Sequence, residues 1–372
     1  MRGFIFGLVI GLIAGVVLAV VQPERRASTG AAGNAAANAA AGGSAAAWRL
    51  ASAYPSNLPH LGARVRSISE TIERVSGGRL KIKLHEPGQL VDTFDGFDAV
   101  ASGTIDAAFA SAAYWGNKSP AFEIFGGVPF GPDMATFLAW FEHGGGRGAY
   151  EKLYGGFNIH AIACGALGPT GAWFAGDVQN SGDLLGRNLA AAGLPARVLS
   201  ALGARVKRIA PSDLFAAFEN KTVSGAVFAG PADDMSLRLH RFAPVYYFPG
   251  WSRQSGFVDL MINMDRWKAL DARIREHLET ACGQSLKAGI AEIEDMQFTA
   301  LKALIRAGVR IERWPAAVVA KLRGTWLRIS VSLAKGDPTF GALIRSLNRF
   351  AEDRAIWREL SSVKSAPPPP VR

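Results

Sequence analysis

The stretch LGARVRSISETIERVSGGRLKIKL, residues 61–84, decides the fold class of this chain. Its first half repeats apolar residues at steps of three and four, which predicts an amphipathic helix over 60–76. Those residues are Leu61, Val65, Ile68, Ile72 and Val75. The pair Gly77-Gly78 ends the helix. Apolar residues then alternate with lysines over 80–84, which predicts a half-buried strand.

The same rhythm extends to both sides of this stretch. We predict a strand over 48–53 before the helix, and after 80–84 a second helix over 94–100 and a strand over 105–110. Strands that alternate with helices in this way are typical of a parallel sheet covered by helices. The sequence therefore predicts an α/β fold.

A second α/β unit and a helical end follow. We predict strands over 157–163, 170–174, 205–209 and 223–229, a helical turn at 181–183, and helices over 194–202 and 212–220. Asp265 caps a long helix that runs to about Ala307 and is interrupted only by Gly283 and Gly289. Helices over 315–335 and 338–361 complete the folded part.

Composition excludes several classes of protein. Of 372 residues, 49% are hydrophobic and only 19% are charged, which rules out disorder for most of the chain and leaves room for two domains. The two cysteines exclude a disulfide-rich scaffold and a cysteine-based zinc finger. Cys164 and Cys282 could pair outside the cytoplasm, but their apolar contexts favour two buried free thiols. The six histidines never occur at metal-ligand spacing, so we predict no metal site.

Both ends of the chain differ from the folded part. Arg2 precedes an uncharged run over 3–21, which is typical of an export signal and long enough for an uncleaved anchor, so residues 1–22 are a signal peptide or a membrane anchor. Residues 23–47 are predicted as a linker, because 27–47 contain 12 Ala and 4 Gly. Residues 362–372 form a proline-rich tail.

No catalytic constellation is present. The chain has no Gly-x-Ser-x-Gly elbow, no phosphate-binding loop and no His-Glu-x-x-His, so we predict that it is not an enzyme and has no cofactor. Asp233-Asp234 could bind a cation, but adjacent carboxylates point apart, and capping of a helix start is the better interpretation.

Aromatic residues at predicted strand ends are more informative. Ligands of open α/β sheets bind beyond the carboxyl ends of strands, so aromatic side chains there can line a cleft for a small organic molecule. The candidates before residue 150 are Tyr54, Tyr114 and Trp115, and those after it are Trp173, Phe228 and Trp251. Ordinary core packing is an equal alternative for each of them.

Several ordered motifs carry a family resemblance. They include Val128-Pro129-Phe130-Gly131, Gly171-Ala172-Trp173-Phe174, Asp183-Leu184-Leu185-Gly186, Gly230-Pro231-Ala232-Asp233-Asp234 and Tyr246-Tyr247-Phe248-Pro249-Gly250-Trp251. Over about 48–360 the chain resembles the solute-binding proteins of TRAP-type secondary transporters, and most of all the branch that binds 2-oxo acids.

The resemblance implies a two-lobed periplasmic binding protein-like fold of type II, with parallel-rich sheets joined by hinge strands and a long helix. Lobe 1 would span 48–172 and lobe 2 would span 173–264, while 265–361 would supply the hinge helix and the helices that complete lobe 1. It also implies a periplasmic receptor that passes a small organic solute to the transporter's membrane subunits.

Four positions depart from the pattern that the resemblance implies. Ala190 stands where the family places an arginine that clamps the ligand carboxylate, and Pro169 stands where the oxo-acid branch has a glutamine. Val227 and Phe228 replace a glutamate that helps to hold a cation and a tryptophan that packs on the ligand.

These replacements suggest that the chain does not bind a 2-oxo acid and a cation in the family manner. A carboxylate without its arginine would be buried and poorly paired, so we expect a more apolar or neutral solute, or none. Arg187 or Arg197 could supply the missing charge from a different turn. We place the ligand near Tyr54, Tyr114, Trp115, Pro169, Ala190, Val227, Phe228 and Trp251.

A second function remains open at this point, namely a membrane-tethered scaffold or sensor with a degenerate pocket. The anchor, linker and proline tail favour it, and the cleft aromatics oppose it. The formal net charge of +10 is no argument for nucleic acid, because residues 301–372 carry +9 while 48–300 carry −1. The basic charge lies on the terminal helices, where a solvated face or a contact with membrane or partner explains it.

Overall fold

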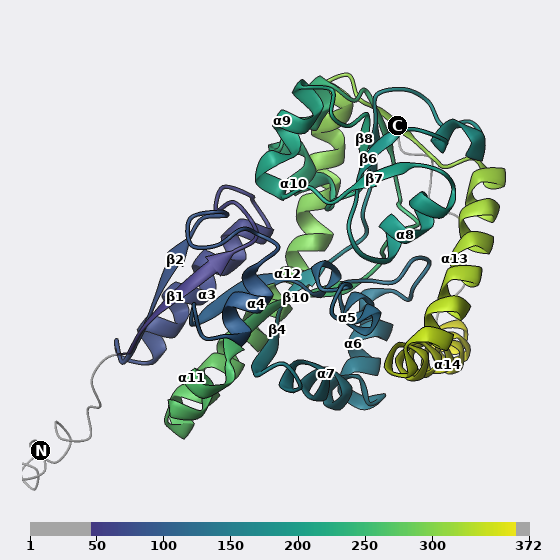
Figure 1. Cartoon of the computed structure of the whole chain (residues 1–372). Coiled ribbons are helices and arrows are strands. Elements are labelled where there is room, and N and C mark those ends of the chain that lie inside the picture. Colours follow the sequence, from purple (N-terminus) through teal and green to yellow (C-terminus); the bar gives the residue numbers. More distant parts are fainter. Residues whose placement is uncertain (1–45, 362–372) are drawn as a thin grey trace, which may run out of the picture. The chain divides into compact units, whose positions relative to one another are not determined.

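The computed structural model describes residues 46–361, and the structural statements below refer to that part of the chain. Its strands form two sheets, one of five strands and one of six, and helices pack around both (Figure 1). This is the mixed α/β, two-lobed fold that the sequence predicts. The predicted export signal or anchor and the proline-rich tail lie outside the described residues.

The first sheet has the strand order β2-β1-β3-β10-β4. Its strands are β1 (Ala46–Ser52), β2 (Leu80–His85), β3 (Ala107–Ser111), β4 (Ile159–Leu167) and β10 (Gly256–Asn263). Strands β1, β2 and β3 pair in parallel, and α3 (Leu61–Val75) and α4 (Gly96–Ala101) connect them. The predicted β-α-β-α-β unit is confirmed, while β10 adds antiparallel pairs to β3 and β4.

Helix α3 shows why the opening stretch decides the fold. Four of its five periodic apolar residues are buried, and only Val75, in the last turn, is exposed, by 43%. Gly77 and Gly78 adopt φ angles of +62° and +76°, a region that glycine enters without steric cost. The chain can therefore reverse directly into β2.

The second sheet has the order β11-β9-β5-β8-β6-β7. Its strands are β5 (Ala172–Phe174), β6 (Asn188–Ala190), β7 (Arg205–Lys207), β8 (Gly225–Ala226), β9 (Val245–Tyr247) and β11 (Arg310–Glu312). The helices around it are α8 (Gly193–Ala201), α9 (Leu214–Glu219) and α10 (Pro231–Ser236), with short 3-10 turns at η2 (Ser181–Leu184), η3 (Pro211–Asp213) and η4 (Leu239–Arg241). The strands of this lobe are much shorter than those of the first.

Two strands belong to the sheet of a different lobe from the elements that precede them in sequence. Strand β10 lies in the first sheet although it follows the second unit in sequence, and β11 lies in the second sheet although it follows the long helix. Strand β1 begins at Ala46, so the last two residues of the predicted linker belong to the sheet. The boundaries 48–172, 173–264 and 265–361 stay predictions.

The predicted long helix is two helices. Asn263 caps α11 (Met264–Ala269), and Asp271 caps α12 (Ala272–Arg306), so the start at Asp265 is wrong. Leu270 has extended backbone angles between them, which ends the first helix. Helix α12 continues through both predicted glycine interruptions and packs against β4, α3 and α10, so it touches elements of both lobes (Figure 1).

The last helices pack against both lobes. Helix α13 (Ala316–Gly336) contacts α8 of the second lobe, and α14 (Pro338–Ser361) contacts three helices that flank the first sheet. These are α5 (Pro120–Phe125), α6 (Met134–His143) and α7 (Gly146–Gly155). Within residues 46–361, no helix has the length and apolar character that a membrane span requires.

Cys164 and Cys282 form a disulfide, so the prediction of two free thiols is wrong. Cys164 lies on β4 and Cys282 lies on α12. The helix packs directly on the strand and brings the two Cα atoms to 4.3 Å across 118 residues of sequence. The apolar context of each cysteine reflected burial, but it held no information about which residues face each other.

Candidate ligand-binding site

A small cavity lies between the two sheets, at the carboxyl ends of their parallel strands. Tyr54 follows β1 and Ser111 ends β3, while Ala190 ends β6 and Val227 follows β8. The cavity offers about 60 Å³ to the centres of water-sized molecules. One water needs roughly 10–15 Å³ on this measure, so the space fits a ligand of few non-hydrogen atoms.

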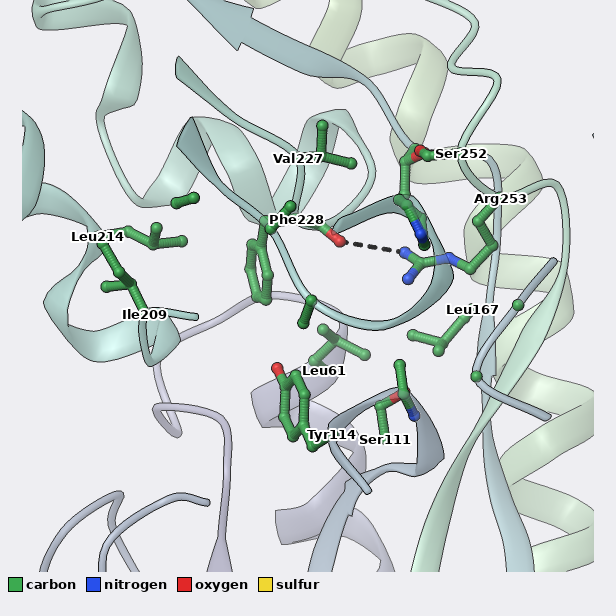
Figure 2. Close-up of a pocket in the computed structure, with 18 of the residues that line it drawn as sticks. Leu61, Ser111, Tyr114, Leu167, Ile209, Leu214, Val227, Phe228, Ser252 and Arg253 are labelled. Carbon is green, nitrogen blue, oxygen red and sulfur yellow. Dashed lines mark hydrogen bonds between the residues drawn. The ribbon is translucent and has the colours of Figure 1, made fainter. Parts of the chain in front are cut away.

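The wall of this cavity has two unlike sides. The first lobe supplies hydroxyl groups from Tyr54, Ser111 and Tyr114, which we call the hydroxyl side, beside Leu61 and Leu167. The second lobe supplies the apolar side, which consists of Ala190, Pro195, Ile209, Leu214, Val227 and Phe228. Figure 2 shows Leu214, Ile209 and Phe228 across the cavity from Arg253 and Leu167.

Five of the eight predicted site residues line the cavity. They are Tyr54, Tyr114, Ala190, Val227 and Phe228. Trp115 is instead buried against Phe97, with ring centroids 5.4 Å apart. Trp251 stacks on Phe130 at 5.9 Å, and Pro169 lines a smaller neighbouring cavity. That any of these residues contacts a ligand stays a prediction.

Arg253 lines the cavity although sequence reasoning missed it. It lies between β9 and β10, on a segment that crosses from the second lobe to the first. Its Nε donates to the carbonyl of Gly168 at 3.2 Å, and its Nη2 donates to the carbonyl of Phe228 at 3.3 Å (Figure 2). The available signal was a charged residue three positions before the buried run 256–263.

Burial shapes the chemistry of the polar groups. It lowers the pKa of Arg253, which the neighbouring Tyr54 and Tyr114 oppose, and the guanidinium stays charged at neutral pH. Burial also raises the pKa of Tyr54 well above its ordinary value, and that of Tyr114 to about 12. Both phenols are therefore protonated. The hydroxyl of Tyr54 donates to that of Tyr114, which leaves the proton of Tyr114 free to donate to an anion.

The two arginines that were expected to substitute for the family clamp do not reach the cavity. Arg187 donates to the carbonyls of Gly176 and Asp177, at 3.1 and 2.7 Å. Arg197 pairs with Glu123 at 2.8 Å. The hypothesis that either one takes the place of the missing arginine is therefore wrong, because both are held by partners elsewhere.

The adjacent acids Asp233 and Asp234 act as structural acceptors. Asp233 accepts from the backbone N–H groups of His60 and Leu61, at 2.9 and 3.3 Å, and so caps the start of α3 from the other lobe. Asp234 accepts from the N–H of Ala229 at 3.1 Å. The prediction that this pair caps its own helix is wrong, because α10 follows Gly230 without a side-chain cap, and Asp233 serves the start of α3 instead.

The cavity wall does not fit a bound cation. A sodium or calcium ion is held by carboxylates, amide carbonyls or backbone oxygens, usually six or more. No Asp, Glu, Asn or Gln lines this cavity, and residues 46–361 contain no cluster of His, Cys, Asp and Glu suited to a metal. The nearest buried acids, Asp233 and Asp234, are already committed to backbone N–H groups.

Contacts on the far side of the cavity join the lobes. Arg208 of the second lobe donates to the carbonyl of Tyr114 at 2.9 Å and lies 4.1 Å from the ring centroid of Phe94. The Arg197–Glu123 pair links α8 to α5. Burial raises the pKa of Glu123, and Arg197 opposes this shift. The lobes thus touch each other at residues next to the cavity.

Comparison with known proteins gives a consistent result. Residues 51–327 match the family model of bacterial extracellular solute-binding proteins, family 7. The chain is 26% identical, over 85% of its length and 87% of the relative's, to a monocarboxylate 2-oxoacid-binding periplasmic protein of Nostoc sp..

Two solved structures are similar over most of their length. One is a TRAP transporter solute-binding protein from Bordetella bronchiseptica with copurified calcium and picolinate, at a TM-score of 0.83 and 28% identity, covering 86% of this chain and 95% of that one. The other, from Pseudoalteromonas atlantica with bound sodium and pyruvate, has a TM-score of 0.81 and 26% identity, with coverages of 85% and 96%.

Proposed function

Since this chain belongs to family 7 of the bacterial extracellular solute-binding proteins, we propose that its ligand is a small monocarboxylic acid held in the cavity between the sheets. The chain is an extracytoplasmic receptor of the TRAP type, which delivers a small organic acid to the membrane subunits of a transporter. The Cys164–Cys282 disulfide fits an oxidising compartment.

The observation that supports this ligand class is the contrast across the cavity. Hydroxyl groups of Ser111 and Tyr114 can donate to a carboxylate, and Tyr54 donates to Tyr114 behind them, while the apolar side can cover a short hydrocarbon group. The small volume favours short acids. A neutral solute, which the four replacements first suggested, would leave the buried charge of Arg253 without a direct ion pair, with only the longer-range attraction of Asp233 and Asp234.

Two further statements remain proposals. Retention of residues 1–22 as an anchor in the inner membrane is one, because these residues lie outside the described part. The other is that the chain catalyses no reaction; the family consists of binding proteins. The alternative of a scaffold with a degenerate pocket is not favoured, since a two-sided cavity is retained between the sheets.

Isothermal titration calorimetry of the purified chain tests the ligand class. The panel would hold pyruvate, lactate and 2-oxobutyrate as monocarboxylates, succinate as a dicarboxylate, and pyruvamide as a neutral analogue of pyruvate. We expect at least one monocarboxylate to bind with a Kd on the order of micromolar, and pyruvamide and succinate to bind at least about 100-fold more weakly. Equal affinity for pyruvamide, or no binding of any acid, would overturn the proposal.

A further inference from the structure

We propose that Arg253 is the carboxylate-binding group of this receptor, and that its guanidinium takes the place of the metal ion. The inference rests on the proposed function, and it adds that the acid binds without sodium or calcium. Similar proteins hold an acid together with a cation, picolinate with calcium in one and pyruvate with sodium in another. In those proteins a metal ion supplies positive charge next to the acid, and in this chain the guanidinium of Arg253 would supply it.

The first step concerns what the cavity wall lacks. It contains no carboxylate and no side-chain amide, so it cannot surround a cation with the charged oxygens that would offset the loss of its water shell. At two positions where the family resemblance implies a glutamine and a glutamate, this chain has Pro169 and Val227. A metal ion beside Arg253 would also meet a like charge at close range.

The second step concerns the unused capacity of Arg253. A guanidinium has five N–H groups, and only two of those of Arg253 have a protein acceptor among the described residues, the carbonyls of Gly168 and Phe228. No carboxylate of residues 46–361 forms an ion pair with it. Three N–H groups and a buried positive charge are thus available, which suits one carboxylate of charge −1.

The third step concerns how Arg253 is held in place. Gly127, also in the cavity wall, has a φ of +121°, and a β-carbon there would lie 2.5 Å from both Cγ and Cδ of Arg253. The stem of the arginine therefore passes through space that only a glycine leaves open. The backbone carbonyl of Arg253 accepts from the N–H of Thr170 at 3.2 Å, which joins the segment of Arg253 to the one that connects β4 with β5. The guanidinium is presented by a fixed backbone.

The arrangement explains the absence of the family arginine at residue 190. One guanidinium neutralises one carboxylate, and a second would leave an excess of positive charge in a small space. Ala190 lies on the apolar side, where it faces the hydrocarbon part of a short acid. The charge has moved from the second lobe to the crossing segment.

Calorimetry with pyruvate tests the inference without any variant. The wild-type chain is first freed of metal by EDTA and dialysis, then titrated in sodium-free choline buffer, and titrated again with sodium and calcium chloride at equal ionic strength. We expect the two Kd values to agree within about twofold, because the charge is built in. Binding that appears only with a cation would overturn the inference and leave the proposed function intact.

Variants locate the charge. Arg253→Gln should weaken pyruvate binding by about 100-fold or more, and Arg253→Lys should restore part of the loss. Arg187→Gln is the matched control and should bind as the wild type does. Circular dichroism checks folding, and if Arg253→Gln does not fold, the lysine variant and the cation series decide. Unchanged affinity in Arg253→Gln would contradict the inference, and no binding of any acid to the wild type would overturn the proposed function together with it.

Discussion

The two sides of the cavity differ in what they offer and in what supports them. The hydroxyl side belongs to the first lobe, where strands of five to nine residues form the sheet and a disulfide ties β4 to α12. The apolar side belongs to the second lobe, where strands have two or three residues. The hydroxyl groups thus lie on the lobe with the longer strands. The apolar side lies on the second lobe, which has a small hydrophobic cluster of its own.

This contrast indicates how a ligand would lie. A carboxylate would face Arg253 and the tyrosine hydroxyls, and a short hydrocarbon group would face Val227 and Phe228. Three residues that differ from the oxo-acid branch, Ala190, Val227 and Phe228, then have a common role as parts of the apolar side. The replacements remove the side chains that would hold a metal ion. The positive charge comes instead from Arg253, on the segment between β9 and β10.

After Arg253 itself, the largest effect is expected at Gly127, which makes room for Arg253. Gly127→Val would drive a side chain into the arginine stem, so we expect pyruvate affinity to fall by about 50-fold or more in calorimetry. Gly88→Ala is the control, because Gly88 also has a positive φ, of +79°, but open space around it. Equal affinity losses in the two variants would show that backbone strain, and not the position of Arg253, is responsible.

A smaller effect is expected on the apolar side. Phe228→Ala keeps the backbone carbonyl that holds Arg253 but removes the ring from the wall. We expect the affinity for pyruvate to fall by about tenfold and the affinity for 4-methyl-2-oxopentanoate to rise, because the cavity becomes longer on that side. Titration of both acids measures the change in their ratio, and a parallel loss for both would contradict the assignment of this side to the hydrocarbon group.

A hydroxyl on the opposite side should matter about as much as one hydrogen bond. Tyr114→Phe removes a protonated phenol and should weaken pyruvate binding by about three- to tenfold. Tyr247→Phe serves as the control, since that hydroxyl donates to the carbonyl of Val178 and does not line the cavity. If the control loses as much affinity as Tyr114→Phe, then the hydroxyl side does not face the ligand.

The smallest effect on binding, but a distinct effect on stability, is expected at the core of the first lobe. Asp259 accepts from the hydroxyls of Tyr150 and Tyr154 at 2.8 and 2.6 Å, and burial raises its pKa to about 7. A raised carboxyl pKa stabilises the folded state most below the unfolded value of about 3.8, and this contribution is lost as pH rises towards 7. Asp259→Asn should therefore gain stability relative to the wild type as pH rises.

Urea unfolding at pH 5 and pH 7.5 measures this difference. Asp183→Asn provides a flat control, because backbone N–H groups of Asn180 and Gln179 lower the pKa of Asp183. Its carboxyl is ionised in both the folded and the unfolded chain at pH 5 and above, so the stability difference from the wild type should be the same at both pH values. Parallel curves for wild type and Asp259→Asn would show that Asp259 does not titrate between these pH values. Pyruvate affinity of Asp259→Asn should stay within about twofold of the wild type.

Local patterns predicted the fold well, and pairings across the chain were harder. The steps of three and four in 61–75 and the glycine pair after them predicted α3 and its end, because both signals are contained in neighbouring residues. The disulfide and the crossing of β10 into the first sheet depend on which distant segments pack together. No local pattern around Cys164 or Cys282 holds that information.

The site was predicted in part for the same reason. Tyr54, Tyr114 and Phe228 follow strands, so their place at a sheet edge could be inferred from the sequence. Arg253 was not predicted because the sequence comparison pointed to position 190, where this chain has Ala190. The arginines close to that position in sequence are Arg187 and Arg197, and Arg253 is far from it. A cation from a crossing segment can reach the same space, and only the three-dimensional arrangement reveals it.

The most direct test of the central claim is a crystal structure of the full chain grown with pyruvate and excess calcium. We predict that the carboxylate lies about 3 Å from the guanidinium nitrogens of Arg253, with the methyl group towards Phe228 and no calcium between ligand and protein. A calcium ion that bridges pyruvate to protein oxygens in the cavity would contradict it, as would a carboxylate bound away from Arg253.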